Sequence, residues 1–192
     1  MSSDDAHTLR KPRSDSVRNR ERLLAAAKAV FTGAGAGAPL EEIARQAGVG
    51  IGTLYRHFPT RNALIAAVYA HEVEQLVSAA DALLAARAPA EALAAWFDLL
   101  IDYMDTKRVV APVLQADPEG GSSVYAAAGP AITGAVGRLM QAARASGDIR
   151  ADITDDDFNR LMIGFSHGYD RPGWAGSARR LIEVMLAGLR PN

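Results

Sequence analysis

The sequence predicts an all-α fold, in which three N-terminal helices precede a larger helical part, with about nine helices in total. Apolar residues recur at spacings of three and four residues along most of the chain, which is the period of one face of a helix. No segment shows the apolar–polar alternation that is typical of a half-buried strand. Hydrophobic residues make up 49% of the chain, and many of them are alanine, a strong helix former.

The first helix is expected to begin at Ser16. Residues 1–15 show no apolar periodicity and are expected to form a flexible tail. Beyond them, apolar side chains recur at helical spacing at Leu23, Leu24, Ala27, Val30 and Phe31. The glycine-rich segment 33–39 ends this helix. A phosphate-binding loop would need a preceding strand and the G-x-G-x-x-G spacing, so an interhelical loop is the better interpretation.

Two short helices and one long helix are expected next. Pro39 suits the first turn of a helix over LEEIARQA, where its missing N–H is not needed. Gly48 is expected to end that helix as a left-handed cap. A second short helix covers about Ile51 to Phe58, and the long helix follows from Arg61.

Helical patterns continue to the C-terminus. We expect helices over 90–106, 109–117, 124–147, 154–169 and 177–190. Thr154 and Asp157 have the spacing of a capping box at the start of one of them.

Charge and composition limit the function classes. Residues 1–61 hold ten Lys and Arg against six Asp and Glu, a net charge of +4, and the remainder carries −5. The basic part could meet a polyanion, although chance variation in surface charge is an equally good explanation. Without cysteine, disulfides and thiolate zinc sites are excluded. No apolar run is long enough for a membrane span or a secretion signal, so a cytoplasmic protein is expected.

The two short helices, joined at AGV, fit a helix-turn-helix. In this motif the second helix enters the major groove of DNA through its N-terminal residues. Leu54 and Phe58, four residues apart, are expected to anchor that helix in a small core. Its outward side chains carry hydroxyl, imidazole and guanidinium groups that can donate to phosphate oxygens.

The segment from Leu40 to Leu64 resembles the DNA-binding signature of the TetR/AcrR family of bacterial regulators, with the sequence LEEIARQAGVGIGTLYRHFPTRNAL. RLLAAAKAVF is similar to the first helix of that family, so the resemblance covers about residues 17–70. APLEEIA, GIGTLYRHFPTR and LIEVMLAGLR resemble the SbtR-like subgroup. The resemblance implies a helix-turn-helix DNA-binding domain over 16–60 and an effector-binding and dimerisation domain over 61–192.

The resemblance also implies which residues meet DNA. Positions that face the groove, touch phosphates or supply a cation correspond to Ile51, Gly52, Thr53, Tyr55, His57 and Arg61. Arg56 is a further DNA-binding candidate because its guanidinium points outward and can pair with guanine, although a solvated side chain is an equally good explanation. Two departures stand out. Gly50 replaces a capping serine, and Pro39 replaces a threonine that often caps a helix and touches phosphate.

The C-terminal half is expected to bind a small hydrophobic effector and to form a homodimer through its last two helices, as the resemblance implies. Aromatic and sulfur-containing side chains suit an apolar ligand. The candidates are Trp96, Phe97, Tyr103, Met104, Tyr125, Met140, Phe165, His167 and Tyr169, although ordinary core packing is the better explanation for any single one of them. Trp174 could close the pocket or cover the dimer edge. One histidine is not a metal site, so no metal and no cofactor are expected.

The expected function is a ligand-responsive, dimeric transcriptional repressor that binds a palindromic operator on double-stranded DNA and does not bind membranes. An activator or a ligand-independent regulator is the alternative within the same class. A helical carrier or enzyme is the alternative from another class. Against an enzyme, the chain lacks H-E-x-x-H, P-loop and G-x-S-x-G motifs, and the acidic run at 155–157 suits a helix N-terminus.

Overall fold

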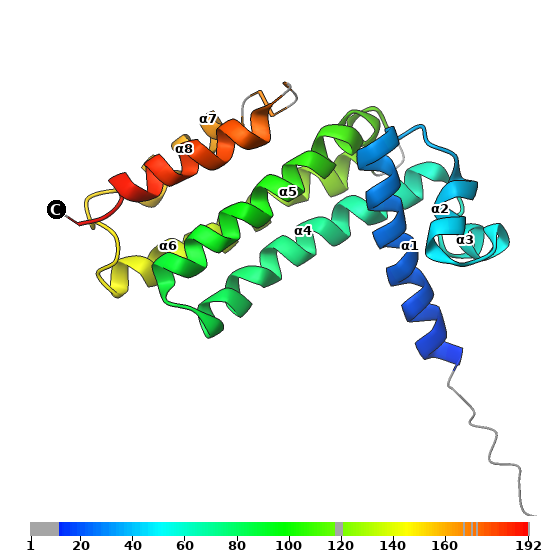
Figure 1. Ribbon diagram of the computed structural model, residues 1–192, viewed down its shortest axis with the longest axis horizontal. Coiled ribbons are helices and arrows are strands. Elements are labelled where there is room, and N and C mark those ends of the chain that lie inside the picture. Colours follow the sequence, from blue (N-terminus) through cyan, green and yellow to red (C-terminus); the bar gives the residue numbers. More distant parts are fainter. Residues whose placement is uncertain (1–11, 118–120, 167, 170, 172, 192) are drawn as a thin grey trace, which may run out of the picture.

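The computed structural model describes residues 12–117, 121–166, 168, 169, 171 and 173–191, and every regular element among them is a helix (Figure 1). Their order is α1 (Pro12–Ala34), α2 (Leu40–Ala47), α3 (Ile51–His57), α4 (Arg61–Ala86), α5 (Pro89–Ala116), α6 (Gly121–Ala145), α7 (Asp155–Ser166) and α8 (Trp174–Gly188). The predicted all-α class is confirmed, with eight helices in the described part of the chain where about nine were expected.

The N-terminal head consists of α1, α2 and α3. Apolar side chains from the three helices meet in a small core, in which Phe31, Ile43 and Leu54 have no exposed surface. Phe58, directly after α3, is also buried there. The two short helices lie at one end of the molecule, far from the C-terminus (Figure 1).

Helix α1 begins one turn earlier than the sequence pattern indicated. It starts at Pro12, so residues 12–15 of the expected tail are helical, while residues 1–11 lie outside the described part. Proline is favoured in the first helical turn, and Asp15 in that turn suits the positive end of the helix dipole. Asp15 also forms an ion pair with Arg18 one turn later.

The larger part of the chain is built on α4, α5 and α6, which pack pairwise against one another. In Figure 1, α5 lies between α4 and α8. The Trp96 indole N–H donates to the Leu76 carbonyl at 2.8 Å, which fixes α5 against α4 deep in the core. None of the described helices is both long enough and apolar enough to cross a bilayer.

Helix α5 corrects one expectation. The segments 90–106 and 109–117 were expected to be separate helices, but they form one continuous helix with Pro112 inside it. Val110, Ala111 and Leu114 are buried and continue the apolar face formed by Leu100 and Met104. Packing of this uninterrupted face against α4 and α6 outweighs the one backbone hydrogen bond that proline removes.

The last two helices cover the outer side of this bundle. As predicted, Thr154 and Asp157 form a capping box: the Asp157 N–H donates to Thr154 Oγ1 at 3.1 Å, and the Thr154 N–H donates to an Asp157 carboxylate oxygen at 3.1 Å. Helix α8 begins at Trp174, three residues before the expected start. It is tied to α5 by Arg179, whose guanidinium lies 3.3 Å from the Asp102 carboxylate.

Two glycines set the path of the chain between α2 and α3. Gly48 has φ of 63° and ψ of 38°, the left-handed conformation that was predicted for it. In this geometry the Gly48 N–H donates to the Arg45 carbonyl and the Val49 N–H donates to the Ala44 carbonyl. Two of the four carbonyls that the end of α2 leaves without a helical partner are thereby satisfied. Gly50 is the N-cap of α3 in ordinary extended backbone, and no side chain caps this helix.

The same substitution at these two glycines should have opposite effects. Gly48→Ser should lower the free energy of unfolding by about 1–2 kcal/mol, because a side chain is strained at positive φ. Gly50→Ser should raise it by a few tenths of a kcal/mol, since serine can cap α3 and its Cβ meets no atom within 4 Å. Urea unfolding followed by circular dichroism measures both. Equal shifts in the two variants would contradict this account of the turn.

Candidate nucleic-acid interface and internal pocket

Helix α3 has one buried side and one exposed side. Leu54 is fully buried and Phe58 is 3% exposed, so these side chains, four residues apart, anchor the helix in the head. Ile51 and Tyr55, also four residues apart, are 37% and 46% exposed. Two large exposed side chains one helical turn apart form a small apolar patch, and exposed apolar patches can mark contacts with other molecules. The exposed side of α3 is therefore a candidate contact surface.

Polar groups on this side are ordered by the helix itself. The Arg56 side chain lies back along α3, donating from Nε to the Gly52 carbonyl at 3.2 Å and from Nη2 to Thr53 Oγ1 at 2.9 Å. The first turn is open, because a Cβ added at Gly50 or Gly52 would meet no heavy atom within 4 Å. The backbone of this turn can thus come close to another molecule.

Two further expected DNA-binding residues, Arg61 and His57, also have intramolecular contacts. Arg61 Nη1 donates to the carbonyls of Ala36 at 3.1 Å and Ala38 at 2.5 Å, so its guanidinium braces the loop between α1 and α2. The half-buried His57 ring lies tilted against Phe58, with 6.1 Å between ring centroids. Their contacts with DNA stay predictions.

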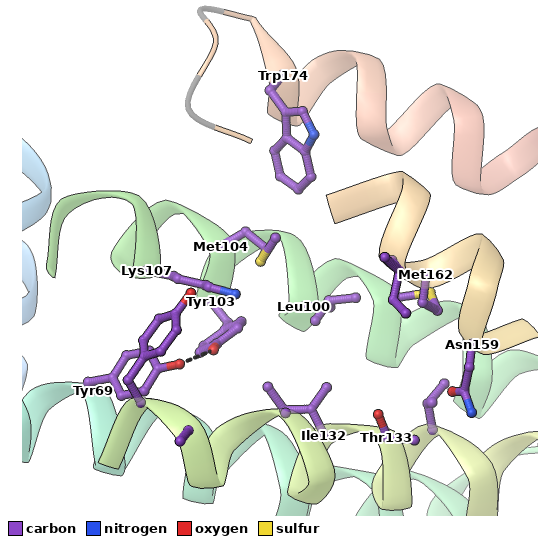
Figure 2. Close-up of a pocket in the computed structure, with 15 residues that line it drawn as sticks. Tyr69, Leu100, Tyr103, Met104, Lys107, Ile132, Thr133, Asn159, Met162 and Trp174 are labelled. Atoms are coloured by element: carbon purple, nitrogen blue, oxygen red, sulfur yellow. Dashed lines mark hydrogen bonds between the residues drawn. The ribbon is translucent and has the colours of Figure 1, made fainter. Parts of the chain in front are cut away.

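An internal pocket of about 330 Å³ lies among α4, α5, α6, α7 and the start of α8 (Figure 2). Its wall combines aromatic rings, aliphatic and methionine side chains, and a few polar groups. The aromatic lining residues are Tyr69, Tyr103, Tyr125 and Trp174; the large apolar ones include Leu100, Met104, Ile132, Val136 and Met162; the polar ones include Lys107, Thr133 and Asn159. This size and composition suit a small, largely apolar molecule.

Three tyrosines from three helices meet at one end of the pocket. The Tyr69 and Tyr103 hydroxyls are 2.8 Å apart and hydrogen-bonded, and the Tyr125 ring stacks on Tyr69 at 5.7 Å. Burial raises the pKa of Tyr69 to about 12, although its bond with Tyr103 partly offsets the effect. Burial and the adjacent Tyr69 also raise the pKa of Tyr103. Both groups are consequently neutral hydroxyls at physiological pH.

The structure divides the expected pocket residues into groups. Tyr103, Met104 and Tyr125 line the pocket. The others do not: Trp96, Phe97 and Met140 are buried core residues, and Tyr169 is half-buried beneath the Lys107 amine. His167 and the side chain of Phe165 lie outside the described residues.

Core packing explains why two aromatic candidates lie away from the pocket. The Trp96 N–H is committed to the Leu76 carbonyl, and the Trp96 ring packs edge-on against Phe97. Phe97 in turn contacts Phe158 of α7, with 6.1 Å between ring centroids. These rings hold α4, α5 and α7 together.

Sequence reasoning missed Tyr69 and Lys107 among the lining residues. Tyr69 lies on α4 and Tyr125 on α6, 56 residues further along the chain, so no local pattern joins the two. Lys107 looks like an ordinary solvated lysine on a helix. A signal was present in the spacing of Tyr103, Met104 and Lys107, which places all three on one face of α5.

The pocket lies next to the contact between the head and the helical bundle, where α1 meets α4. Lys28 of α1 forms an ion pair with Glu72 of α4, and Glu72 is only 6% exposed. A small hollow of about 100 Å³ beside this pair is also lined by Tyr103, which belongs to the pocket wall as well. Tyr69 and Glu72 are three residues apart on α4, so the pocket and the ion pair share one segment of that helix.

A second exposed apolar surface lies on the last two helices. Leu161 and Ile163 of α7 are 44% and 62% exposed, and Leu181 and Val184 of α8 are 55% and 70% exposed. Leu181 and Val184, three residues apart, share one side of α8, whereas Leu161 and Ile163, two residues apart, point to different sides of α7, and Ile163 also lines the pocket. Exposed large apolar side chains can mark protein contacts. We call these four residues the α7–α8 face.

Comparisons with known proteins agree with this architecture. Residues 23–68 match the family described as bacterial regulatory proteins, tetR family, and residues 88–191 match the C-terminal domain of SbtR-like transcriptional regulators. A TetR transcriptional regulator from Streptomyces coelicolor has 45% identity and a TM-score of 0.80, over 90% of this chain and 99% of that one. A TetR regulatory protein from Mycobacterium vanbaalenii has 33% identity and a TM-score of 0.78, over 94% and 100%.

More distant structures share the fold. GusR of Salmonella enterica has 22% identity and a TM-score of 0.64, with 95% of this chain and 98% of that chain covered. No curated protein matches the sequence.

The buried tyrosine pair should make stability fall at alkaline pH. Because the folded-state pKa of Tyr69 is raised above that of an unfolded tyrosine, near 10, its contribution is complete below about pH 10 and is lost as the pH rises towards about 12. Urea unfolding between pH 8 and pH 11 should show this decline. Tyr69→Phe should flatten it, whereas Tyr55→Phe, at an exposed tyrosine, is the control. Equal slopes in the wild type and Tyr69→Phe would contradict the assignment.

Proposed function

The chain belongs to the TetR family of bacterial regulatory proteins, and from this premise we propose a dimeric repressor that a small apolar effector releases from a palindromic operator. Its homologues are transcriptional regulators rather than enzymes. Such a protein works where the chromosome is, so we place it in the cytoplasm. The observation that carries the proposal is the outward side of α3, which the head core holds in a fixed orientation.

The exposed side of α3 has the chemistry that a major groove requires. Ile51 can make apolar contact with a thymine methyl, and the bare backbone at Gly52 permits close approach. Hydroxyls of Thr53 and Tyr55 can donate to phosphate oxygens, which fix the register of the helix on the duplex. Arg56 can pair with a guanine edge if it leaves its bonds along α3.

A binding-site selection with the full-length protein, followed by fluorescence anisotropy on the selected duplex, tests DNA recognition. We expect sequence-specific binding that weakens as salt rises. Tyr55→Ala should weaken it about 10- to 100-fold, because a hydrogen bond to a charged phosphate is worth about 1.5–3 kcal/mol.

Tyr55→Phe separates the hydroxyl from the ring in this experiment. If the hydroxyl carries the contact, Tyr55→Phe should lose nearly as much affinity as Tyr55→Ala. Unchanged affinity in Tyr55→Ala would remove Tyr55 from the interface. A protein that selects no sequence would contradict the proposed function itself.

The α7–α8 face supports the homodimer. A two-fold dimer buries the same patch from both subunits, so apolar residues on adjacent helices can cover one another. Two heads related in this way can bind half-sites about one helical turn apart. Helices α7 and α8 lie on the outer side of the bundle, away from α3 (Figure 1).

Val184→Asp should convert the dimer into monomers, because it places a charge on the most exposed apolar residue of the face. Sedimentation velocity at micromolar concentration measures the change. Val17→Asp introduces the same charge at a valine that is 56% exposed on α1, and it should leave the dimer intact. A dimer that survives Val184→Asp would place the interface elsewhere.

Effector response can follow from the shared helix α4. The pocket wall includes Tyr69, while Glu72 holds the head through Lys28. A ligand that binds more tightly when α4 is displaced must lower the affinity for operator DNA, because the two binding equilibria are linked. A reporter assay with and without the gene shows whether the regulator represses.

A further inference from the structure

We propose that the pocket takes an apolar carboxylic acid whose carboxylate lies beside the Lys107 amine. This inference rests on the proposed function, because it names the chemical class of the effector for that same pocket. It depends on three observations: the charge balance of the pocket wall, the surroundings of the amine, and the distribution of polar and apolar groups along the cavity.

The pocket wall carries one positive charge and no negative charge within the described residues. Lys107 is the cation, and no aspartate or glutamate lines the cavity. No carboxylate forms an ion pair with Lys107 in the part of the chain that the structure describes. The tyrosines do not supply the missing charge, since burial keeps Tyr69 and Tyr103 protonated.

Aromatic rings surround the amine in place of a counter-ion. Lys107 Nζ lies 5.4 Å from the ring centroid of Tyr125 and 5.5 Å from that of Tyr169. Cation–π contacts hold the amine in place but leave its N–H donors able to bond a ligand. The Tyr69–Tyr103 pair adds another donor, because the hydroxyl that accepts the shared bond keeps its own proton.

The rest of the cavity favours an apolar body. In Figure 2, Lys107 and the tyrosine pair lie at one end, whereas Asn159 lies at the other, with Leu100 and Ile132 between them. A neutral apolar ligand would take water from the ammonium without replacing its hydrogen bonds. A cationic ligand would meet a like charge. A carboxylate gains a charge-assisted hydrogen bond, which is about twice as strong as a neutral one.

Head-group pairs test the inference directly. Isothermal titration calorimetry at pH 7 compares octanoate with 1-octanol and 4-phenylbutyrate with 4-phenyl-1-butanol, using the full-length protein. We expect each acid to bind about 10-fold or more tightly than its alcohol, since a charged hydrogen bond is worth about 1.5–3 kcal/mol. Comparing the octyl pair with the phenylbutyl pair shows whether an aliphatic or an aromatic ligand fits the cavity better.

Substitutions assign the preference to Lys107. Lys107→Met should abolish the preference for the acid while keeping the affinity for the alcohol, and Lys107→Arg should retain it. Arg108→Met removes the adjacent, exposed cation of α5 and is the matched control that should leave the preference unchanged. Thermal unfolding of each variant separates a folding defect from a lost contact.

The inference is overturned if the alcohols bind as tightly as the acids, if no acid binds, or if Lys107→Met keeps the preference. Operator release, measured by anisotropy in the same solutions, separates this inference from the proposed function. Acid binding that leaves operator DNA bound supports the ligand class and contradicts the effector role. Failure to bind any operator contradicts the regulator, whatever the pocket takes.

Discussion

The buried ion pair between Lys28 and Glu72 joins the two parts of this protein. A carboxylate that is 6% exposed is costly unless a cation lies beside it, so α1 and α4 are held at one position along their lengths. The head core and the bundle core meet at that joint. Because Glu72 lies one turn from Tyr69, the orientation of α3 depends on the same stretch of α4 that forms the tyrosine end of the pocket.

Sequence reasoning succeeded where contacts are local. The buried positions of Leu54 and Phe58 and the left-handed Gly48 follow from spacings of a few residues, which the sequence displays directly. The capping box of α7 follows for the same reason. Each of these features depends on the geometry of one helix or one turn, and a single sequence is sufficient to predict it.

The pocket was only partly predictable because its wall combines helices that are distant in sequence. Composition identifies aromatic residues but not the direction in which they point. Trp96 and Tyr103 lie on the same helix, yet Trp96 packs in the core and bonds to α4, whereas Tyr103 lines the cavity. The continuity of helix α5 could not be predicted for the same reason, because it depends on contacts with helices that are distant in sequence. Residues 90–106 and 109–117 were expected to form two helices, and only packing against α4 and α6 shows why they form one helix that includes Pro112.

The open first turn of α3 bears on how this protein can evolve. Since side chains at positions 50 and 52 would project into empty space, single substitutions there change the exposed side of α3 without disturbing the packed head. For the regulator proposed above, selection can therefore alter operator preference in small steps while folding, assembly and effector response stay intact. A duplicated gene could acquire a new set of target promoters through these two codons before any other part of the protein had to change.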